Sequence, residues 1–297
     1  MKRGTSVAVA LIFFIGLLLA TGVSWASQQY TVSGLVLKVD RPHGVFVVSC
    51  NRIPGYMDAM VMSFSVRKPE SLDGVEPSAM VEFVLHVDGN SSYADDLRVR
   101  NFESVEQEPQ EAQRLKVLQN IANPDAQVKP LAMGEVVPDF EFTDQNQQRI
   151  ALSQFAGEVV VLTFIYTRCP NPNYCFRLNN NLGRLQKRFP QGLGHDLVLL
   201  SIVVDPEHDQ GKTLTNYANI WRANPQGWHF LTGPLPDIQK VTRMFGMDFW
   251  NGEGVVTHSF HTIVIDQRRK LAANIEGNQF TAQQLGDLVE TMLPQKN

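Results

Sequence analysis

The sequence has few cysteines, no long run of lysine and arginine, and little excess charge. Its 3 cysteines in 297 residues are too few for a fold held together by disulfides. A formal net charge of −4 and the lack of a basic run argue against nucleic acid as the main partner. Hydrophobic residues make up 43% of the chain and charged residues 19%, which excludes a disordered tail protein. The length favours two modest domains or one large one.

The first 26 residues have the pattern of an export signal. Lys2 and Arg3 precede an apolar run over residues 7–23, and small residues within 24–26 suit cleavage by signal peptidase. The run is also long enough to span a bilayer if tilted, so an uncleaved anchor is the alternative. No later stretch is long and apolar enough to cross a bilayer. Under either interpretation the rest of the chain lies outside the cytoplasm, where paired thiols tend to form disulfides.

Residues 27–102 are predicted to form a small all-β domain. Runs of strand-forming residues are separated by turn signals, and no stretch has a helical period. Five short strands in so few residues favour a small Greek-key barrel. The predicted strands are residues 30–37, 45–48, 60–66, 80–87 and 97–99.

Residues 103–134 are predicted to be an acidic, partly helical linker, and residues 135–297 an α/β domain. A continuous apolar run at 159–166 is typical of a central strand covered on both faces. Thr281 and Gln284 form a capping box before the last helix. The predicted order β-α-β-α-(α)-β-β-α indicates a mixed sheet sandwiched by helices.

Two cysteines follow the predicted central strand, at the edge where open α/β sheets place their sites. Cys169 and Cys175 are separated by a loop that Pro170 and Pro172 stiffen. Because Cys175 lies near a helix N-terminus, we expect a lowered pKa for its thiol. The spacing alone leaves an inert disulfide as open as a functional pair.

A histidine adds a third soft donor. His258 lies just before the predicted strand 262–265, and two sulfurs with one imidazole make a good copper set. His261 is a competitor, and residues three apart in an extended segment point to opposite faces, so only one of the two should reach the cysteines. The alternative is that His258 is an ordinary surface residue.

Four segments, residues 137–140, 164–170, 201–206 and 257–259, resemble the SCO/SenC family in sequence and in order. The resemblance covers about residues 135–293 and implies a thioredoxin-like copper chaperone that helps assemble the copper A centre of cytochrome c oxidase. It also implies that Cys169, Cys175 and His258 are copper ligands. The family usually has three residues between its cysteines, whereas this sequence has five.

The same resemblance singles out an aspartate. Asp205 matches the family's acidic residue near the site and would dock a partner or support the ligands. The alternative is a turn residue at the end of a strand, since Pro206 follows it.

The N-terminal domain has its own sulfur cluster. Met60 and Met62 are two apart in a predicted strand, so both thioethers project from one face. A turn at residues 53–56 folds Cys50 back toward Met60, and Met57 lies in the connecting loop. Such a set suits Cu(I) and rejects Zn(II) and hard cations. The alternative is that the methionines fill a core and Cys50 is an apolar, half-buried thiol.

Residues 48–50 and 53–64 resemble the CusF-type periplasmic copper-binding domain, a small OB-like barrel. The resemblance implies that Met60 and Met62 are the methionine pair of its Cu(I) site. Cys50 stands about where that family has a histidine, and Met57 where it has a tryptophan. Both replacements carry sulfur, so the site would stay soft.

Together these features predict an exported, two-module copper metallochaperone of the periplasm or the outer face of the cytoplasmic membrane. The barrel would capture Cu(I) and pass it across the linker to the second site, and the protein would hold copper as Cu(I), Cu(II) or both. The recipient would be a cytochrome c oxidase subunit or another copper-site protein. The alternative is a thiol–disulfide oxidoreductase in which Cys169 attacks and Cys175 resolves, and this leaves open whether the protein is an enzyme. A peroxidase is a weaker third option, and no hydrolytic constellation, phosphate loop or flavin fingerprint competes.

Overall fold

The structure is a computed structural model of the whole chain. It describes residues 28–89, 91–100, 129–247, 249–252 and 255–294. The predicted export signal and residues 103–128 of the predicted linker lie outside these ranges. Within them, no helix has the length and apolar character needed to cross a bilayer.

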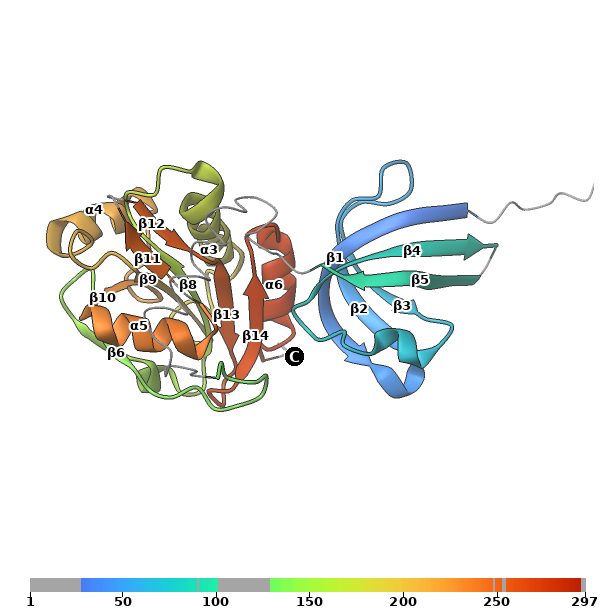
Figure 1. Cartoon of the computed structure of the whole chain (residues 1–297), viewed down its shortest axis with the longest axis horizontal. Helices are drawn as coiled ribbons and strands as arrows, with labels where there is room; N and C mark the ends of the chain where they lie inside the picture. The colour runs from blue at the N-terminus through green and yellow to red at the C-terminus, as the bar shows by residue number, and fades with distance from the viewer. Residues whose placement is uncertain (1–27, 90, 101–128, 248, 253–254, 295–297) are drawn as a thin grey trace, which may run out of the picture.

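The N-terminal part is one antiparallel sheet with the strand order β3-β2-β1-β4-β5 (Figure 1). Its five predicted strands are confirmed, and the first and last are longer than predicted because polar residues at their ends also pair. A short 3-10 turn, Arg41–His43, joins β1 to β2, and another, Pro69–Leu72, lies in the crossover from β3 to β4. The strands are β1 (Gln28–Asp40), β2 (Val45–Cys50), β3 (Val61–Ser65), β4 (Met80–Asp88) and β5 (Ser91–Val99).

The all-β character of this part is confirmed, whereas a closed OB-like barrel is not. Within the described residues, the edge strands β3 and β5 are joined by an isolated parallel bridge between Val66 and Ala94 and not by a continuous ladder. Phe46, Phe64 and Phe83 fill the interior, with ring centroids 4.8 to 5.7 Å apart. The sheet therefore curls around an aromatic core without closing.

The C-terminal part is a seven-stranded mixed sheet with the order β14-β13-β8-β9-β10-β6-β7 (Figure 1). Strands β8, β9 and β10 are parallel, and the outer strands pair antiparallel. Every residue of β8 and β9 is buried, as expected for central strands covered on both faces. The strands are β6 (Glu141–Asp144), β7 (Arg149–Ala151), β8 (Val159–Ile165), β9 (Leu197–Val203), β10 (Trp228–Thr232), β13 (His261–Ile265) and β14 (Leu271–Glu276).

The α/β class is thus confirmed, but the predicted element order is incomplete. It lacked β6, β7 and β10, and also the hairpin of β11 (Phe249–Gly252) and β12 (Val255–His258). These strands have three to five residues, too few for a periodic pattern. The predicted helices and the capping box of the last one are confirmed. The helices are α3 (Arg177–Arg188), α4 (Gly211–Ile220), α5 (Leu235–Met244) and α6 (Ala282–Glu290).

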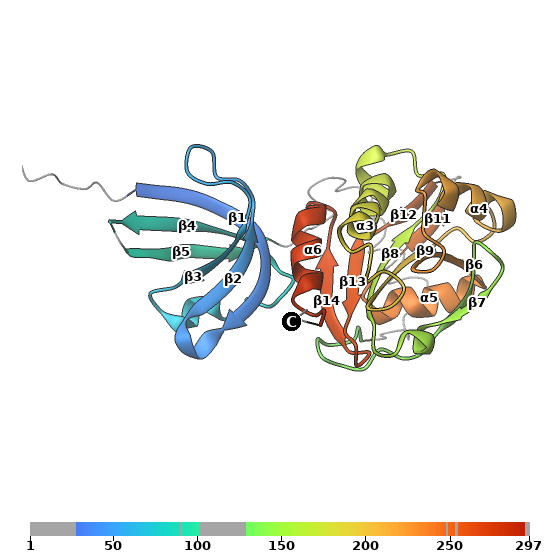
Figure 2. The ribbon, with the colours of Figure 1, turned by 180° about the vertical axis from the view of Figure 1, so that it is seen from behind.

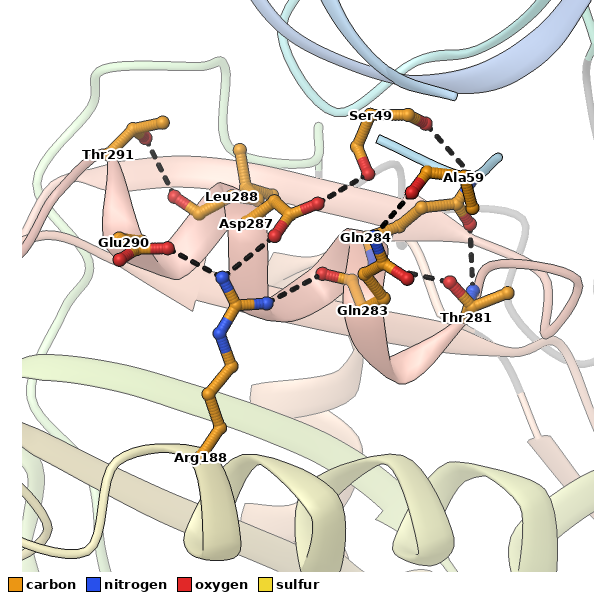
Figure 3. Close-up of polar contacts among 10 residues, drawn as sticks. All are labelled: Ser49, Ala59, Arg188, Thr281, Gln283, Gln284, Asp287, Leu288, Glu290 and Thr291. Carbon is orange, nitrogen blue, oxygen red and sulfur yellow. Dashed lines mark hydrogen bonds and ion pairs between the residues drawn. The ribbon is translucent and has the colours of Figure 1, made fainter. Parts of the chain in front are cut away.

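Helix α6 lies between the two sheets, as Figures 1 and 2 show from opposite sides. Figure 3 shows the polar contacts across this boundary. The Ser49 hydroxyl donates to Asp287 Oδ2 at 2.6 Å, and Gln284 Nε2 donates to the Ser49 carbonyl at 3.1 Å. Gln283 Nε2 donates to the Ala59 carbonyl at 3.3 Å, and Arg188 pairs with Asp287 at 2.7 Å. Ser49, Gln284 and Asp287 are buried, whereas Ala59, Arg188 and Gln283 lie at the exposed rim. We call this set of contacts the α6 boundary.

Alternation along β1 and β2 gives these strands two different faces. Leu35 and Leu37 pack into the C-terminal hydrophobic core, on the side of α6. Val36 lies between them in β1, and Val48 and Cys50 lie in the paired strand β2. All three pack into the N-terminal core. The same strands therefore wall the N-terminal core on one face and cover α6 with the other.

Candidate metal centre

The cysteine loop begins where the two central strands end. The Val204 N–H donates to the Ile165 carbonyl at 2.8 Å, so β8 and β9 finish together. Residues 172–176 then form a single π-type turn that leads directly into α3. The Asn171 side chain accepts from the Asn173 N–H at 2.9 Å and caps this turn, and Pro172 suits its first position. Local sequence thus sets both the start of the helix and the place of the cysteines.

The two thiols of this loop have opposite properties. Cys169 is half-buried, and a hydrogen bond from Cys175 lowers the pKa of its thiol to about 6. Cys175 is fully buried, and both this hydrogen bond and burial raise the pKa of its thiol well above the usual value. Both residues are free cysteines. The predicted lowering at Cys175 is therefore wrong, because burial and donation to its neighbour outweigh the helix N-terminus; the lowered pKa belongs to Cys169.

The turn after β9 holds the residues just before Cys169. Arg168 Nη2 donates to Asp205 Oδ2 at 2.7 Å, and His208 Nδ1 lies 2.9 Å from Asp205 Oδ1. Burial opposes ionisation of Asp205, but the hydrogen bonds and charges of His208 and Arg168 lower its pKa. Asp205 thus supports the loop through Arg168, and no contact of its own with a cysteine is seen among the described hydrogen bonds.

A second carboxylate in the same turn was missed by sequence reasoning. Asp209 is fully buried and accepts from both the backbone N–H and the hydroxyl of Thr167. The sequence offered one signal, the position of Asp209 four residues after Asp205 and just before a predicted helix. A carboxylate that is buried there needs a nearby hydrogen-bond donor.

The other side of the loop is fixed to the segment before α6. Asn278 Nδ2 donates to the Asn173 carbonyl at 2.6 Å, and Arg177 Nη2 donates to the Gln279 carbonyl at 3.1 Å. The loop between the cysteines is therefore held by contacts from two distant stretches of chain.

His258 is the last residue of β12, and its backbone pairs with Phe249 of β11. Its side chain lies outside the described part of the structure. Its competitor His261 is buried in β13, with Nδ1 2.8 Å from Asn274 Oδ1. Thr262 of β13 pairs with Thr163 of β8, so the residues before β13 lie at the end of the sheet that carries the cysteine loop. Among the described side chains, no group of three or more histidines, cysteines and carboxylates is placed to hold a metal.

The β2–β3 ladder aligns three of the four sulfur residues predicted to bind copper in the N-terminal domain. Val48 pairs with Met62, and the Cys50 N–H donates to the Met60 carbonyl at 2.9 Å, so Cys50, Met60 and Met62 share one face. The three side chains differ in exposure: Cys50 is 1% exposed, Met62 is partly buried and Met60 is 47% exposed. Met57 is partly buried against the same core and bridges to Ile53.

Cys50 itself is a thiol in an apolar setting. Burial raises its pKa to about 12, and its Sγ lies 3.7 Å from the Val48 carbonyl. Gly34 stands opposite it in β1, where an added Cβ would lie 2.4 Å from the Ser49 carbonyl and 2.9 Å from Cys50 Cα. Glycine is required there, because only a bare Cα lets β1 approach β2 so closely.

Residues 128–293 match the SCO1/SenC family. A SCO1 protein homologue of Bacillus subtilis (strain 168) is 33% identical over 107 residues, which are 36% of this chain and only 53%, about half, of that relative. Among solved structures, a SCO1/SenC family lipoprotein from Bacillus anthracis str. Ames is 26% identical, with a TM-score of 0.49 over 56% of this chain and 99% of its own. Arabidopsis thaliana ScoI with copper bound is 23% identical, with a TM-score of 0.46 over 54% of this chain and 97% of its own. Because the family match covers more than half of the sequence, this chain belongs to the SCO1/SenC family.

Proposed function

We propose that this protein is an exported copper metallochaperone that binds copper through Cys169, Cys175 and His258. The observation that carries the proposal is the thiol pair at the end of β8, in which a half-exposed sulfur with a pKa of about 6 is backed by a buried one. Thiolate sulfur selects Cu(I), and imidazole suits both oxidation states of copper. Membership of the SCO1/SenC family supports the same interpretation.

The register of β13 on β8 supports the assignment of His258. Residue 258 lies four positions before Thr262, which pairs with Thr163 near the carboxyl end of β8. An imidazole delivered to this end of the sheet would complete a three-coordinate site with the two sulfurs. Cys169 would bind as the thiolate that it already is at neutral pH, and Cys175 would lose its proton on binding.

We further propose a second Cu(I) site at Cys50, Met60 and Met62, with Met57 beside it. The shared face of the β2–β3 ladder supports this site, because it aligns one thiol with two thioethers and leaves Met60 open to solvent. Residues 27–102 would then be a CusF-like, OB-like module, joined by the linker 103–134 to a thioredoxin-like module at 135–297. Residues 1–26 would direct the chain to the periplasm, or hold it at the outer face of the cytoplasmic membrane.

In this proposal the chain carries copper as cargo from the N-terminal site to the C-terminal one. The recipient would be a cytochrome c oxidase subunit or another protein with a copper site that contains thiolates. Both steps exchange soft ligands around the metal, so Cu(I) passes without a change of oxidation state.

The asymmetry of the thiol pair also favours a second function, thiol–disulfide exchange. The Cys169 thiolate would attack a disulfide of the partner and form a mixed disulfide, releasing one partner thiolate. Cys175 would then lose its proton and attack Cys169 Sγ, releasing the second partner thiolate and leaving a Cys169–Cys175 disulfide. The partner gains two electrons and the cysteine pair loses two.

An anaerobic Cu(I) titration of the exported form tests the copper proposal. We expect two copper ions per chain, and one each for Cys50→Ala and Cys169→Ala. His258→Ala should weaken the C-terminal site without changing the reduction potential of the Cys169–Cys175 pair in a glutathione buffer. If Cys169→Ala and His258→Ala bind copper as the unaltered chain does, the metallochaperone proposal is wrong.

A further inference from the structure

Asp209 has an unusual place next to the cysteine loop. Its side chain is fully buried in the turn between β9 and α4. Oδ2 accepts from the Thr167 N–H at 2.8 Å, and Oδ1 accepts from the Thr167 hydroxyl at 2.5 Å. Burial is the largest influence on this carboxyl and raises its pKa, while the two bonds from Thr167 oppose that shift. Burying a carboxylate costs free energy unless hydrogen bonds compensate for the lost water. The place of Asp209 therefore calls for a specific structural role.

The turn that carries Asp209 is rigid enough to act as a fixed point. The Asp209 and His208 N–H groups both donate to the Asp205 carbonyl, at 2.8 and 3.1 Å. The same turn holds Arg168 through Asp205. Two successive residues, Thr167 and Arg168, are thus each bound by a carboxylate immediately before the loop reaches Cys169.

We infer that Asp209 is a positioning residue for the Cys169–Cys175 pair, acting through Thr167. It fixes the point where the chain leaves β8, two residues before Cys169, so the half-exposed sulfur is held against the buried one. A loop held at this point keeps the effective concentration of one sulfur at the other high, which favours both a chelated Cu(I) and an intramolecular disulfide. The inference rests on the proposed function of this pair, but its test does not require copper.

The hydrogen bonds, and not the negative charge, should matter. In Asp209→Asn the remaining oxygen can accept from the Thr167 N–H, and the amide can donate to the Thr167 hydroxyl, so both contacts survive. In Asp209→Ala both are lost. Thr167→Val has nearly the same shape as threonine and loses one contact, and Thr167→Ser restores it.

The test is the reduction potential of the full chain in a glutathione redox buffer, without copper. For Asp209→Ala we expect disulfide formation to become about tenfold less favourable, a rise of about 30 mV for a two-electron couple. Thr167→Val should shift the same equilibrium about threefold, while Asp209→Asn and Thr167→Ser should stay close to the unaltered chain. Anaerobic Cu(I) affinity should fall in the same order.

Asp144→Ala is the matched control. Asp144, the last residue of β6, is also a nearly fully buried carboxylate. It accepts from the N–H groups of Asn146 and Gln148 in its own turn, and His229 Nδ1 lies 3.3 Å from its Oδ2. Its loss should lower the melting temperature without moving the potential. If Asp209→Ala lowers only the melting temperature, as Asp144→Ala does, the positioning role is wrong. If the reduction potentials change as expected but neither the unaltered chain nor any variant binds Cu(I), the copper proposal fails and the positioning role stands.

Discussion

The two sulfur clusters of this chain differ in what surrounds their cysteines. Cys50 packs among apolar side chains of the N-terminal core, and burial raises its pKa to about 12. Cys169 leaves the end of a central strand half-exposed, and a hydrogen bond from a second thiol lowers its pKa to about 6. At neutral pH one is a thiol and the other a thiolate. The same residue type therefore offers two kinds of ligand, because burial acts on Cys50 and the hydrogen bond from Cys175 acts on Cys169.

The clusters also differ in the direction they face. Ser49 reaches Asp287 across the α6 boundary, and the Asn51 side chain accepts from Gln284. Cys50 lies between these two residues in an extended segment, so its sulfur points to the opposite face, into the N-terminal core. Strand β2 thus stands between the Cys50 sulfur and α6. Under the proposed function, copper passing between the two sites of one chain would have to go round this strand.

The largest expected effect is on thiol reactivity. With a pKa of about 6, Cys169 is about nine-tenths thiolate at neutral pH, whereas Cys50 is thiolate to about one part in 10⁵. An acidic thiol is intrinsically the weaker nucleophile, so the expected ratio of alkylation rates is at least about a hundredfold in favour of Cys169. Peptide mass spectrometry after timed iodoacetamide treatment measures both rates. The Cys169 rate should fall as the pH drops through about 6, because its thiolate is then protonated. Equal rates at the two sites would remove the contrast.

A second experiment isolates the cause of the low pKa at Cys169. The hydrogen bond from Cys175 is the largest influence on it. Cys175→Ala removes that donor, so the midpoint of the pH–rate profile should move up by about two units, toward that of an ordinary thiol. Cys175→Ser keeps a donor of similar size and should keep most of the lowering. If the alanine variant titrates like the unaltered chain, the helix N-terminus and not Cys175 controls the thiolate.

Substitutions at the α6 boundary test whether β2 couples the N-terminal sheet to α6. Asp287→Ala removes the acceptor of the Ser49 hydroxyl and leaves Arg188 without its buried partner, at a cost of about 2 kcal/mol of unfolding free energy. Ser49→Ala should cost about 1 kcal/mol, since it removes one neutral donor. Urea unfolding measures both. Two separate transitions in Asp287→Ala, against one in the unaltered chain, would show that this contact couples the sheets, and an unchanged single transition with unchanged stability would contradict it.

Most of the architecture was predictable from the sequence because the long elements carry strong periodic signals. The continuous apolar run of β8 and the Thr281–Gln284 capping box are local features, and both predictions are confirmed. The short strand β10 has no such signal, and its place between β9 and β6 depends on the tertiary fold. Closure of the N-terminal sheet depends on how two distant edge strands meet, which no local pattern encodes.

The chemistry of the site was less predictable than its location. Helix position suggested the wrong cysteine for the low pKa, because the burial of Cys175 and its donation to Cys169 follow from tertiary packing. Asp209 was missed for the same reason. Its donor, Thr167, lies 42 residues earlier, and the contact exists only because β8 and β9 end together.

The smallest expected effect on stability, and a sharp one on metal binding, comes from the N-terminal methionines. Met60 is 47% exposed, while Met62 is partly buried against the N-terminal core. Replacement of either by leucine keeps the volume, so each should cost less than about 1 kcal/mol, and Met60→Leu the less of the two. Leucine has no sulfur, so both variants should lose about tenfold or more in Cu(I) affinity at the N-terminal site while the C-terminal site is unchanged. A methionine that only fills the core would show the stability cost without the loss of Cu(I) affinity. Unaltered Cu(I) affinity in Met62→Leu would therefore identify Met62 as a packing residue. Cys50 would then be a buried thiol with no metal to bind.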